Sequence, residues 1–201
     1  LAKIKRVIVS TYQAVSGAGK EGIDELDAQV REHSEGREMT ANILPSASAE
    51  KHYPIAFNLI PQIDVFCDNL YTKEEMKMVN ETKKIMEDYE MRITATTIRV
   101  PVYRSHSESV NIELEKEVDL GAMREALAKF PGVTVQDDPS KQEYPMPLYT
   151  SEKDDVYVGR LRRDESCEKS YNMWVVGDQI RKGAALNTLQ IAETMIKNGW
   201  I

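Results

Sequence analysis

The chain has 201 residues, enough to bury one sizeable hydrophobic core. Its net charge of −7 argues against a nucleic-acid partner, and no apolar run is long enough to span a bilayer. Hydrophobic residues make up 41% of the chain, as in ordinary soluble globular proteins, and two cysteines are too few for a disulfide framework. We therefore expect a cytoplasmic protein with no membrane or nucleic-acid partner.

The first half of the chain is predicted to form a strand and two helices separated by a long loop. Apolar, β-branched residues predict a strand over Lys5–Ser10, and apolar residues spaced by three and four predict a helix over Glu21–His33. Prolines and serines break any periodicity over Ser34–Pro61, which predicts a loop. The clearest helix is Thr72–Tyr89, because its first residue and Glu75 have the spacing of a capping box.

The second half alternates short strands with helices. Strands are predicted over Ile93–Val102, Ser109–Leu114, Val133–Val135, Val156–Leu161 and Met173–Val176, and helices over Leu120–Phe130 and Ala184–Asn198. The order lacks the strict strand–helix alternation of a parallel sheet. This favours an α+β fold with a mixed or antiparallel sheet and helices on one face.

Glycines between the first strand and helix match two nucleotide-binding patterns only in part. Gly17–Gly22 fits G-x-G-x-x-G, but no predicted strand follows the helix closely, as a dinucleotide-binding unit requires. Gly19 and Lys20 lack the earlier glycine and the following Ser or Thr of a P-loop. We interpret the segment as a glycine-rich turn where a ligand is able to approach the backbone closely.

Three polar residues, remote in sequence, lie at or near predicted strand ends. Gln13 follows the first strand. Arg99 sits in a β-branched strand and needs an anionic partner, which is either a substrate carboxylate or one of the many acidic side chains of the chain. His106 has small hydroxyl neighbours and is either a general acid–base group or a surface histidine. We expect these three groups to meet around one pocket.

Two charges at the start of the Thr72 helix also have two interpretations. Glu74 and Lys77 are three residues apart and share one helix face. Because a helix N-terminus attracts anions, Lys77 is placed to hold a phosphate, and Glu74 is placed to receive a substrate ammonium group. The alternative is a solvated ion pair on the surface of the helix.

Six stretches together resemble the C-terminal, catalytic and dimerisation half of the aspartate-semialdehyde dehydrogenase family. They are Ser10–Gly19, Phe57–Asp64, Glu74–Lys77, Ile98–Val102 with His106–Glu108, Val158–Arg162 and Gly177–Ala185, in family order. The resemblance implies a homodimer with a glyceraldehyde-3-phosphate-dehydrogenase-like C-terminal domain. It also implies that residues 1–183 form the catalytic and dimerisation domain, and that 184–201 form a helix that packs on a nucleotide-binding domain missing from this chain.

The family is an oxidoreductase that uses a cysteine thiolate and NADPH to convert aspartyl 4-phosphate into aspartate semialdehyde, on the route to lysine, threonine and methionine. By motif position, the resemblance makes His106 the general acid–base residue and lets Gln13 orient the acyl group. It assigns the substrate α-carboxylate to Arg99, the amino group to Glu74 and the leaving phosphate to Lys77. Near the nicotinamide of NADP it places Ser16, Gly17 and Gln179.

In the family, the nucleophilic cysteine and the main NADP site precede the strand that opens this chain. Cys67 and Cys167 have acidic or apolar neighbours that disfavour a thiolate, so we expect neither to replace that nucleophile. We therefore expect the chain alone to be inactive, and we expect no metal site. Two alternatives stay open: a non-catalytic homodimerisation module, or a relative of N-acetylglutamyl-phosphate reductase. Glu74 and Arg99 favour a substrate with a free amino group over an acetylated one.

Overall fold

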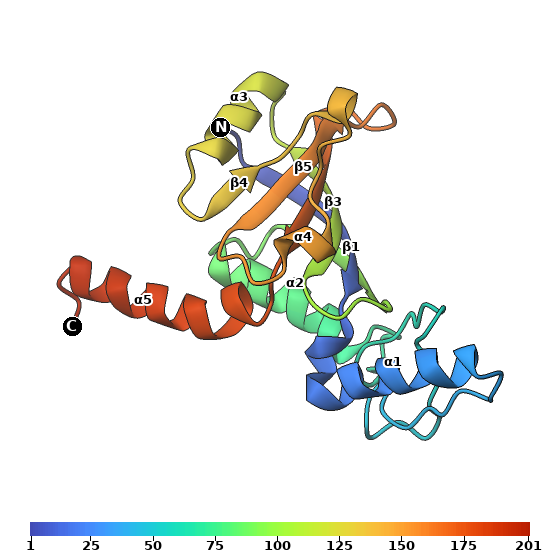
Figure 1. Ribbon diagram of the computed structural model, residues 1–201. Helices are drawn as coiled ribbons and strands as arrows, with labels where there is room; N and C mark the ends of the chain where they lie inside the picture. The colour runs from blue at the N-terminus through green and yellow to red at the C-terminus, as the bar shows by residue number, and fades with distance from the viewer.

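The structure is a computed structural model that describes residues 1–201. Its strands are β1 (Ile4–Gln13), β2 (Arg92–Arg99), β3 (His106–Leu114), β4 (Val133–Val135), β5 (Val156–Arg163) and β6 (Ser170–Gly177). They form one sheet in the order β2-β1-β3-β6-β5-β4 (Figure 1). The β1–β2 and β4–β5 pairs are parallel and the other three pairs are antiparallel. The predicted α+β fold with a mixed sheet is confirmed.

The helices also follow the sequence pattern closely. They are α1 (Gly19–Ser34), α2 (Lys73–Ile85), α3 (Leu120–Ala128), α4 (Pro147–Thr150) and α5 (Leu186–Lys197), with short helical turns η1 (Val15–Ala18), η2 (Pro139–Lys141) and η3 (Arg181–Ala185). The sequence did not predict α4, which is a single turn begun by a proline. Two predicted boundaries next to site residues were wrong: the first strand was predicted to end at Ser10 and the third to begin at Ser109, whereas β1 extends to Gln13 and β3 starts at His106, so both residues belong to the sheet itself.

Helices α2 and α3 pack on the same face of the sheet. On β2, the Thr97 hydroxyl lies 3.5 Å from the hydroxyl of Thr72, the N-cap of α2, and the Thr97 N–H donates to the Glu75 carboxylate of α2 at 3.0 Å. Thr97 is level with Glu108 of β3 across the intervening β1. Leu114 lies on the same face of β3 as Glu108, six residues along, and packs in one core cluster with Met123 of α3. The prediction of helices on one face is therefore confirmed.

The long segment between α1 and α2 contains no helix or extended strand, as its prolines predict. Side chains of α1 hold its backbone in place. The buried Gln29 carboxamide oxygen accepts from the N–H groups of Ile55 and Ala56 at 2.8 and 3.0 Å. The Glu25 carboxylate accepts from the N–H of Asn42 at 2.6 Å. These bonds satisfy backbone groups that have no ladder partner, so the segment is ordered without regular structure.

The last helix, α5, extends away from the rest of the domain (Figure 1). None of its residues is buried, and the side chains of Leu189, Ile191 and Ile196 are all more than half exposed. An apolar face of this kind normally packs on another surface. The docking of residues 184–201 on a nucleotide-binding domain stays a prediction. None of the helices combines the length and the apolar character that crossing a membrane requires.

The N-cap of α2 joins that helix to the sheet. The Thr72 hydroxyl accepts from the Glu75 N–H at 3.2 Å, and the Glu75 carboxylate accepts from the Thr72 N–H at 2.8 Å. We expect Thr72→Ala to lower the free energy of unfolding by about 1–2 kcal/mol in urea denaturation. Lys73→Ala, one residue away and exposed, should change it by less than about 0.5 kcal/mol. Equal effects would contradict the capping role.

Candidate active site

One peptide segment at the end of β1 binds both an imidazole and a guanidinium. The backbone N–H of Ala14 donates to Nδ1 of His106 at 3.1 Å, and the Ala14 carbonyl accepts from Nη1 of Arg99 at 2.7 Å. Strands β2 and β3 flank β1, and Arg99 ends β2 while His106 begins β3. The register of the sheet therefore brings Gln13, Arg99 and His106, which are remote in sequence, to the same end of the sheet.

His106 is an imidazole held neutral by its surroundings. Burial, together with the nearby Arg99 guanidinium, lowers the pKa of His106 to about 3, and Asp178 opposes this shift only weakly. The ring therefore carries no charge at neutral pH. Its Nδ1 accepts a hydrogen bond from the backbone, and its Nε2 has no partner within the protein.

Arg99 keeps its charge although it is buried. Burial lowers its pKa to about 10, and the nearby Glu74 carboxylate opposes the shift. The guanidinium donates to Ala14, but its Nε has no hydrogen-bond partner. A buried cation with unused donors in a fork arrangement is suited to a carboxylate.

The lack of a side chain at Gly17 makes room for both groups. A Cβ added there would lie 2.6 Å from Nη1 of Arg99 and 3.4 Å from Cε1 of His106. Gly17 is exposed and opens this point to a ligand. The glycine is therefore required by the close approach of two functional side chains and not by its own backbone conformation.

Glu74 and Lys77 partly follow the surface alternative considered from the sequence. Nζ of Lys77 lies 3.6 Å from the Glu74 carboxylate, and the Lys77 side chain is 56% exposed. Glu74 is less exposed, at 24%, and also accepts a long hydrogen bond of 3.4 Å from Nε2 of Gln13. Glu74 thus faces the site, whereas Lys77 lies at its rim.

The site consists of two adjoining hollows, not the single pocket that the sequence suggested. A cleft of about 510 Å³ has Gly17, Glu74 and Arg99 in its wall, together with residues of the segment that follows α1. A smaller hollow of about 270 Å³ is lined by His106, Gln179 and other residues near the end of β6. Gly17 approaches both Arg99 and His106, so the η1 turn lies between the two hollows.

The three residues expected near a nicotinamide lie together. Nε2 of Gln179 donates to the Ser16 hydroxyl at 2.6 Å, and the Gln179 carbonyl oxygen accepts from the Ser105 N–H at 3.1 Å. The Ser16 hydroxyl keeps its own proton for another acceptor. Gly17 follows Ser16 directly and lines the Arg99 cleft, whereas Gln179 lines the His106 hollow.

Sequence reasoning missed two acidic residues beside the imidazole. Glu108 follows His106 on the same strand face, lines the same hollow, and its pKa is raised by burial. Asp178 is fully buried, and Nε of Arg104 binds its carboxylate at 2.7 Å. The two-residue spacing on a strand was a usable signal for Glu108, because side chains two apart share a face. No pattern in the sequence around Asp178 indicates that it lies near the site.

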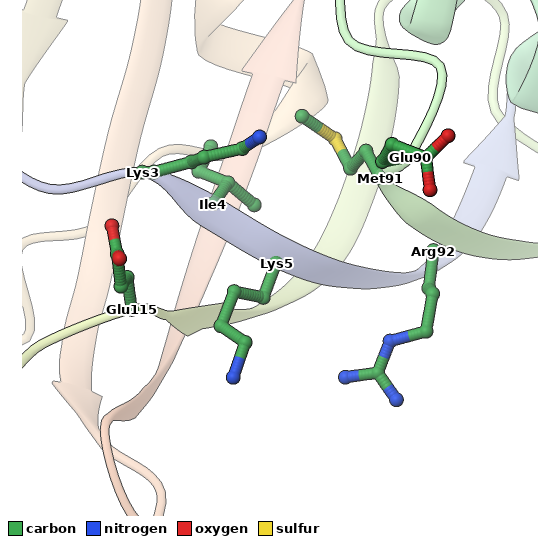
Figure 2. Close-up of a pocket in the computed structure, with 7 residues that line it drawn as sticks. All are labelled: Lys3, Ile4, Lys5, Glu90, Met91, Arg92 and Glu115. Carbon is green, nitrogen blue, oxygen red and sulfur yellow. The ribbon is translucent and has the colours of Figure 1, made fainter.

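A third hollow lies at the opposite end of β1 and is a charged surface (Figure 2). Figure 2 shows Lys3, Lys5 and Arg92 around it. Each cation has an acidic neighbour: Lys3 lies 3.1 Å from Asp88, and Lys5 and Arg92 lie 3.9 and 3.2 Å from Glu113. None of the site residues expected from the sequence lines this hollow.

Comparison with known proteins agrees with this geometry. Residues 1–182 match the family model described as semialdehyde dehydrogenase, dimerisation domain. The chain belongs to the semialdehyde dehydrogenase dimerisation-domain family.

Relatives of this dimerisation domain carry one common name. Aspartate-semialdehyde dehydrogenases of Aquifex aeolicus and Bacillus subtilis are 51% and 50% identical over 200 and 195 residues, which is 100% and 96% of the chain. The solved structure of aspartate semialdehyde dehydrogenase II from Vibrio cholerae, complexed with ASA, matches with 42% identity and a TM-score of 0.89 over 98% of the chain. The chain spans only 56–57% of the length of these proteins.

Neither cysteine of the dimerisation domain lies at the site. Cys67 occupies a turn before α2, where its N–H donates to the Tyr71 carbonyl. Cys167 lies in the turn between β5 and β6. Neither lines the Arg99 cleft or the His106 hollow. That neither thiol acts as the nucleophile stays a prediction.

Gly17→Ala tests the close approach at the η1 turn. The new methyl group should displace the Arg99 guanidinium from the Ala14 carbonyl and lower the free energy of unfolding by about 1–3 kcal/mol, measured in urea. Gly183→Ala is the matched control, because its Cβ would lie at an ordinary 3.8 Å from Gln179. If Gly17→Ala were no less stable than the control, the guanidinium would have room to move and the argument would be wrong.

His106 should also make stability depend on pH. Its folded-state pKa lies below the unfolded value of about 6.5, so the unfolded chain binds the proton first as the pH falls. The stabilisation is complete above about pH 6.5 and is lost toward about pH 3, by up to about 1.4 kcal/mol per pH unit. His106→Asn should remove this part of the slope between about pH 4 and 6 in urea denaturation, and an unchanged slope would contradict the argument.

Proposed function

We propose that this chain is the catalytic and dimerisation half of an aspartate-semialdehyde dehydrogenase. The intact protein is then an oxidoreductase of amino-acid biosynthesis that reductively dephosphorylates aspartyl 4-phosphate to aspartate semialdehyde. The observation that carries the proposal is the pairing of Arg99 and His106 on the two sides of the Ala14 peptide groups. A guanidinium that is able to bind a carboxylate, next to a buried and uncharged imidazole, suits an amino-acid substrate with a reactive acyl group.

Each site residue then has one task. Arg99 holds the substrate α-carboxylate, and Glu74 receives the amino group. Gln13 orients the acyl group, and His106 is the acid–base residue beside it. Lys77, whose side chain is 56% exposed and whose Nζ lies 3.6 Å from the Glu74 carboxylate, binds the leaving phosphate. The 42% identical Vibrio cholerae protein complexed with ASA supports a substrate of this class.

NADP is the proposed cofactor, and it supplies the hydride when bound. Ser16, Gly17 and Gln179 would hold the nicotinamide end. Support comes from the unused hydroxyl proton of Ser16 and from the open backbone of Gly17. The main cofactor site and the nucleophilic cysteine are proposed to lie on the part of the relatives that this chain does not span.

The same proposal gives α5 a partner. Its exposed apolar face, with Leu189 and Ile196, would pack on the nucleotide-binding part of the intact protein. The name of the family model supports a homodimer as the working unit. We further propose that the enzyme works in the cytoplasm, where amino-acid biosynthesis takes place.

The 201-residue chain alone is the first test. We expect no aspartate-semialdehyde-dependent reduction of NADP with phosphate as co-substrate, measured by absorbance. We expect turnover once the chain is joined to the nucleotide-binding part found in its relatives. Turnover by the chain alone would contradict the proposal. N-acetylglutamate semialdehyde, assayed in the same way, distinguishes this proposal from a relative of N-acetylglutamyl-phosphate reductase. Its acetylated amine has no charge for Glu74 to receive, so the proposal expects it to be the poorer substrate.

Variants of the joined protein test the assigned tasks. Arg99→Lys should raise KM for the semialdehyde at least about tenfold, because lysine cannot form the bidentate fork. Arg31→Lys, on the exposed side of α1, is the control and should leave KM unchanged. An unchanged KM in Arg99→Lys would mean that the guanidinium does not bind the substrate.

A further inference from the structure

The carboxylate of Asp178, the residue after β6, is fully buried and joins three segments of the chain. Its Oδ2 lies 2.7 Å from Nε of Arg104, in the loop before β3, and accepts from the Glu152 N–H, in the turn after α4, at 2.7 Å. Its Oδ1 accepts from the Ile180 N–H at 2.9 Å, in the turn that leads to η3. A buried carboxylate is costly unless it is paired, so these contacts hold the three segments together.

Gln179 follows Asp178 directly and binds two segments with its side chain. Its carbonyl oxygen accepts from the Ser105 N–H at 3.1 Å, and its Nε2 donates to the Ser16 hydroxyl at 2.6 Å. Ser105 directly follows Arg104, so the two neighbouring side chains after β6 bind adjacent residues of one loop. The carboxamide therefore has a fixed orientation, with its oxygen toward the loop before β3 and its nitrogen toward η1.

The loop before β3 needs this support, because the backbone of Ser105 is in an unfavourable conformation. Its φ is 70°, in the left-handed region that residues with a side chain adopt rarely. Ser105 is fully buried, and its hydroxyl lies 3.3 Å from the Ser151 hydroxyl. Contacts with neighbouring groups must stabilise such a conformation, and the pairing of Arg104 with Asp178 anchors the residue directly before it.

We propose that Asp178 is a positioning residue, whose carboxylate holds the loop before β3 and the turn that carries Gln179 in one arrangement, so that the carboxamide stays directed at Ser16 and the nicotinamide end of the cofactor. This inference rests on the proposed function, which assigns the cofactor contacts, and adds a residue that has no exposed surface of its own. Asp178 does not line the cleft that contains Arg99. Its loss therefore weakens cofactor binding and leaves binding of the semialdehyde unchanged.

Nitrogen NMR relaxation of the 201-residue chain tests the orientation of the carboxamide without any activity. Nε2 of Gln179 should have an order parameter above about 0.8, as a rigid group does. Asp178→Asn replaces one acceptor oxygen by a donor where all the neighbouring groups are donors, so the value should fall below about 0.6. Asp154→Asn, which removes a half-exposed carboxylate that pairs with Arg181, is the matched control and should leave it unchanged. An unchanged value in Asp178→Asn would overturn the proposal.

Binding of NADP to the joined protein, measured by calorimetry, tests the role itself. Gln179→Ala and Asp178→Asn should each raise the Kd about fivefold, while KM for the semialdehyde changes by less than about twofold. The double variant should bind NADP no more weakly than Gln179→Ala alone, because a residue that acts through Gln179 then has nothing left to position. Losses that add up, or an equal rise in KM for the semialdehyde, would mean a general structural role and would overturn the proposal.

A second variant covers the case in which Asp178→Asn does not fold, as judged by circular dichroism. Arg104→Gln removes the cation and keeps the carboxylate, so it should lower the order parameter of Gln179 in the same direction, and an unchanged value would overturn the proposal. If the wild-type joined protein neither bound NADP nor turned over the semialdehyde, the proposed function would fail. The NMR comparison would still decide whether Asp178 orients Gln179.

Discussion

The peptide groups of Ala14 are the constraint on which the site depends. Their N–H binds the imidazole of His106, and their carbonyl binds the guanidinium of Arg99. A backbone in an extended strand end cannot rotate to change these roles, so both side chains are oriented by the sheet itself. Sites built on strands in this way are held more precisely than sites on flexible loops. The glycine three residues later leaves the space that both side chains occupy.

Burial gives this arrangement its chemistry. Charged forms are costly away from water, so the environment lowers the pKa of His106 to about 3 and of Arg99 to about 10. The two shifts have different consequences at neutral pH: the imidazole becomes neutral, and the guanidinium stays charged. One environment thus provides a charged guanidinium and an uncharged imidazole side by side. Glu108 responds to the same burial in the opposite direction, because its charged form is the anion.

The remaining walls of the site depend on long-range side-chain bonds. The segment after α1 has no regular structure, yet it contributes to the cleft that contains Arg99. The side chains of Gln29 and Glu25 accept hydrogen bonds from its backbone N–H groups, as a neighbouring strand would in a sheet. Beyond the site, α5 exposes an apolar face, and the chain spans only 56–57% of the length of the relatives it matches.

Local patterns in the sequence were sufficient for most elements. Hydrophobic periodicity placed the main helices and strands, and the Thr72–Glu75 spacing correctly identified the cap of α2. Proline and serine marked the irregular segment after α1. Boundaries were less accurate: the polar ends of β1 and β3, at Gln13 and His106, were placed outside their strands. Sheet pairing from neighbouring strands overrides the weak strand preference of such residues.

The sequence by itself determined the class of fold and the types of side chain available for chemistry, because both follow from short-range periodicity and residue identity. It left open whether Arg99 pairs with an acidic side chain or holds a substrate, and whether His106 is a surface residue or an acid–base group. Only the tertiary structure showed that both contact the peptide groups of Ala14, because β1 lies between β2 and β3 in one register. The contacts of Ala14 and the burial of Asp178 likewise depend on residues 26 to 92 positions away. No local pattern encodes such contacts, because they arise from how separate elements pack.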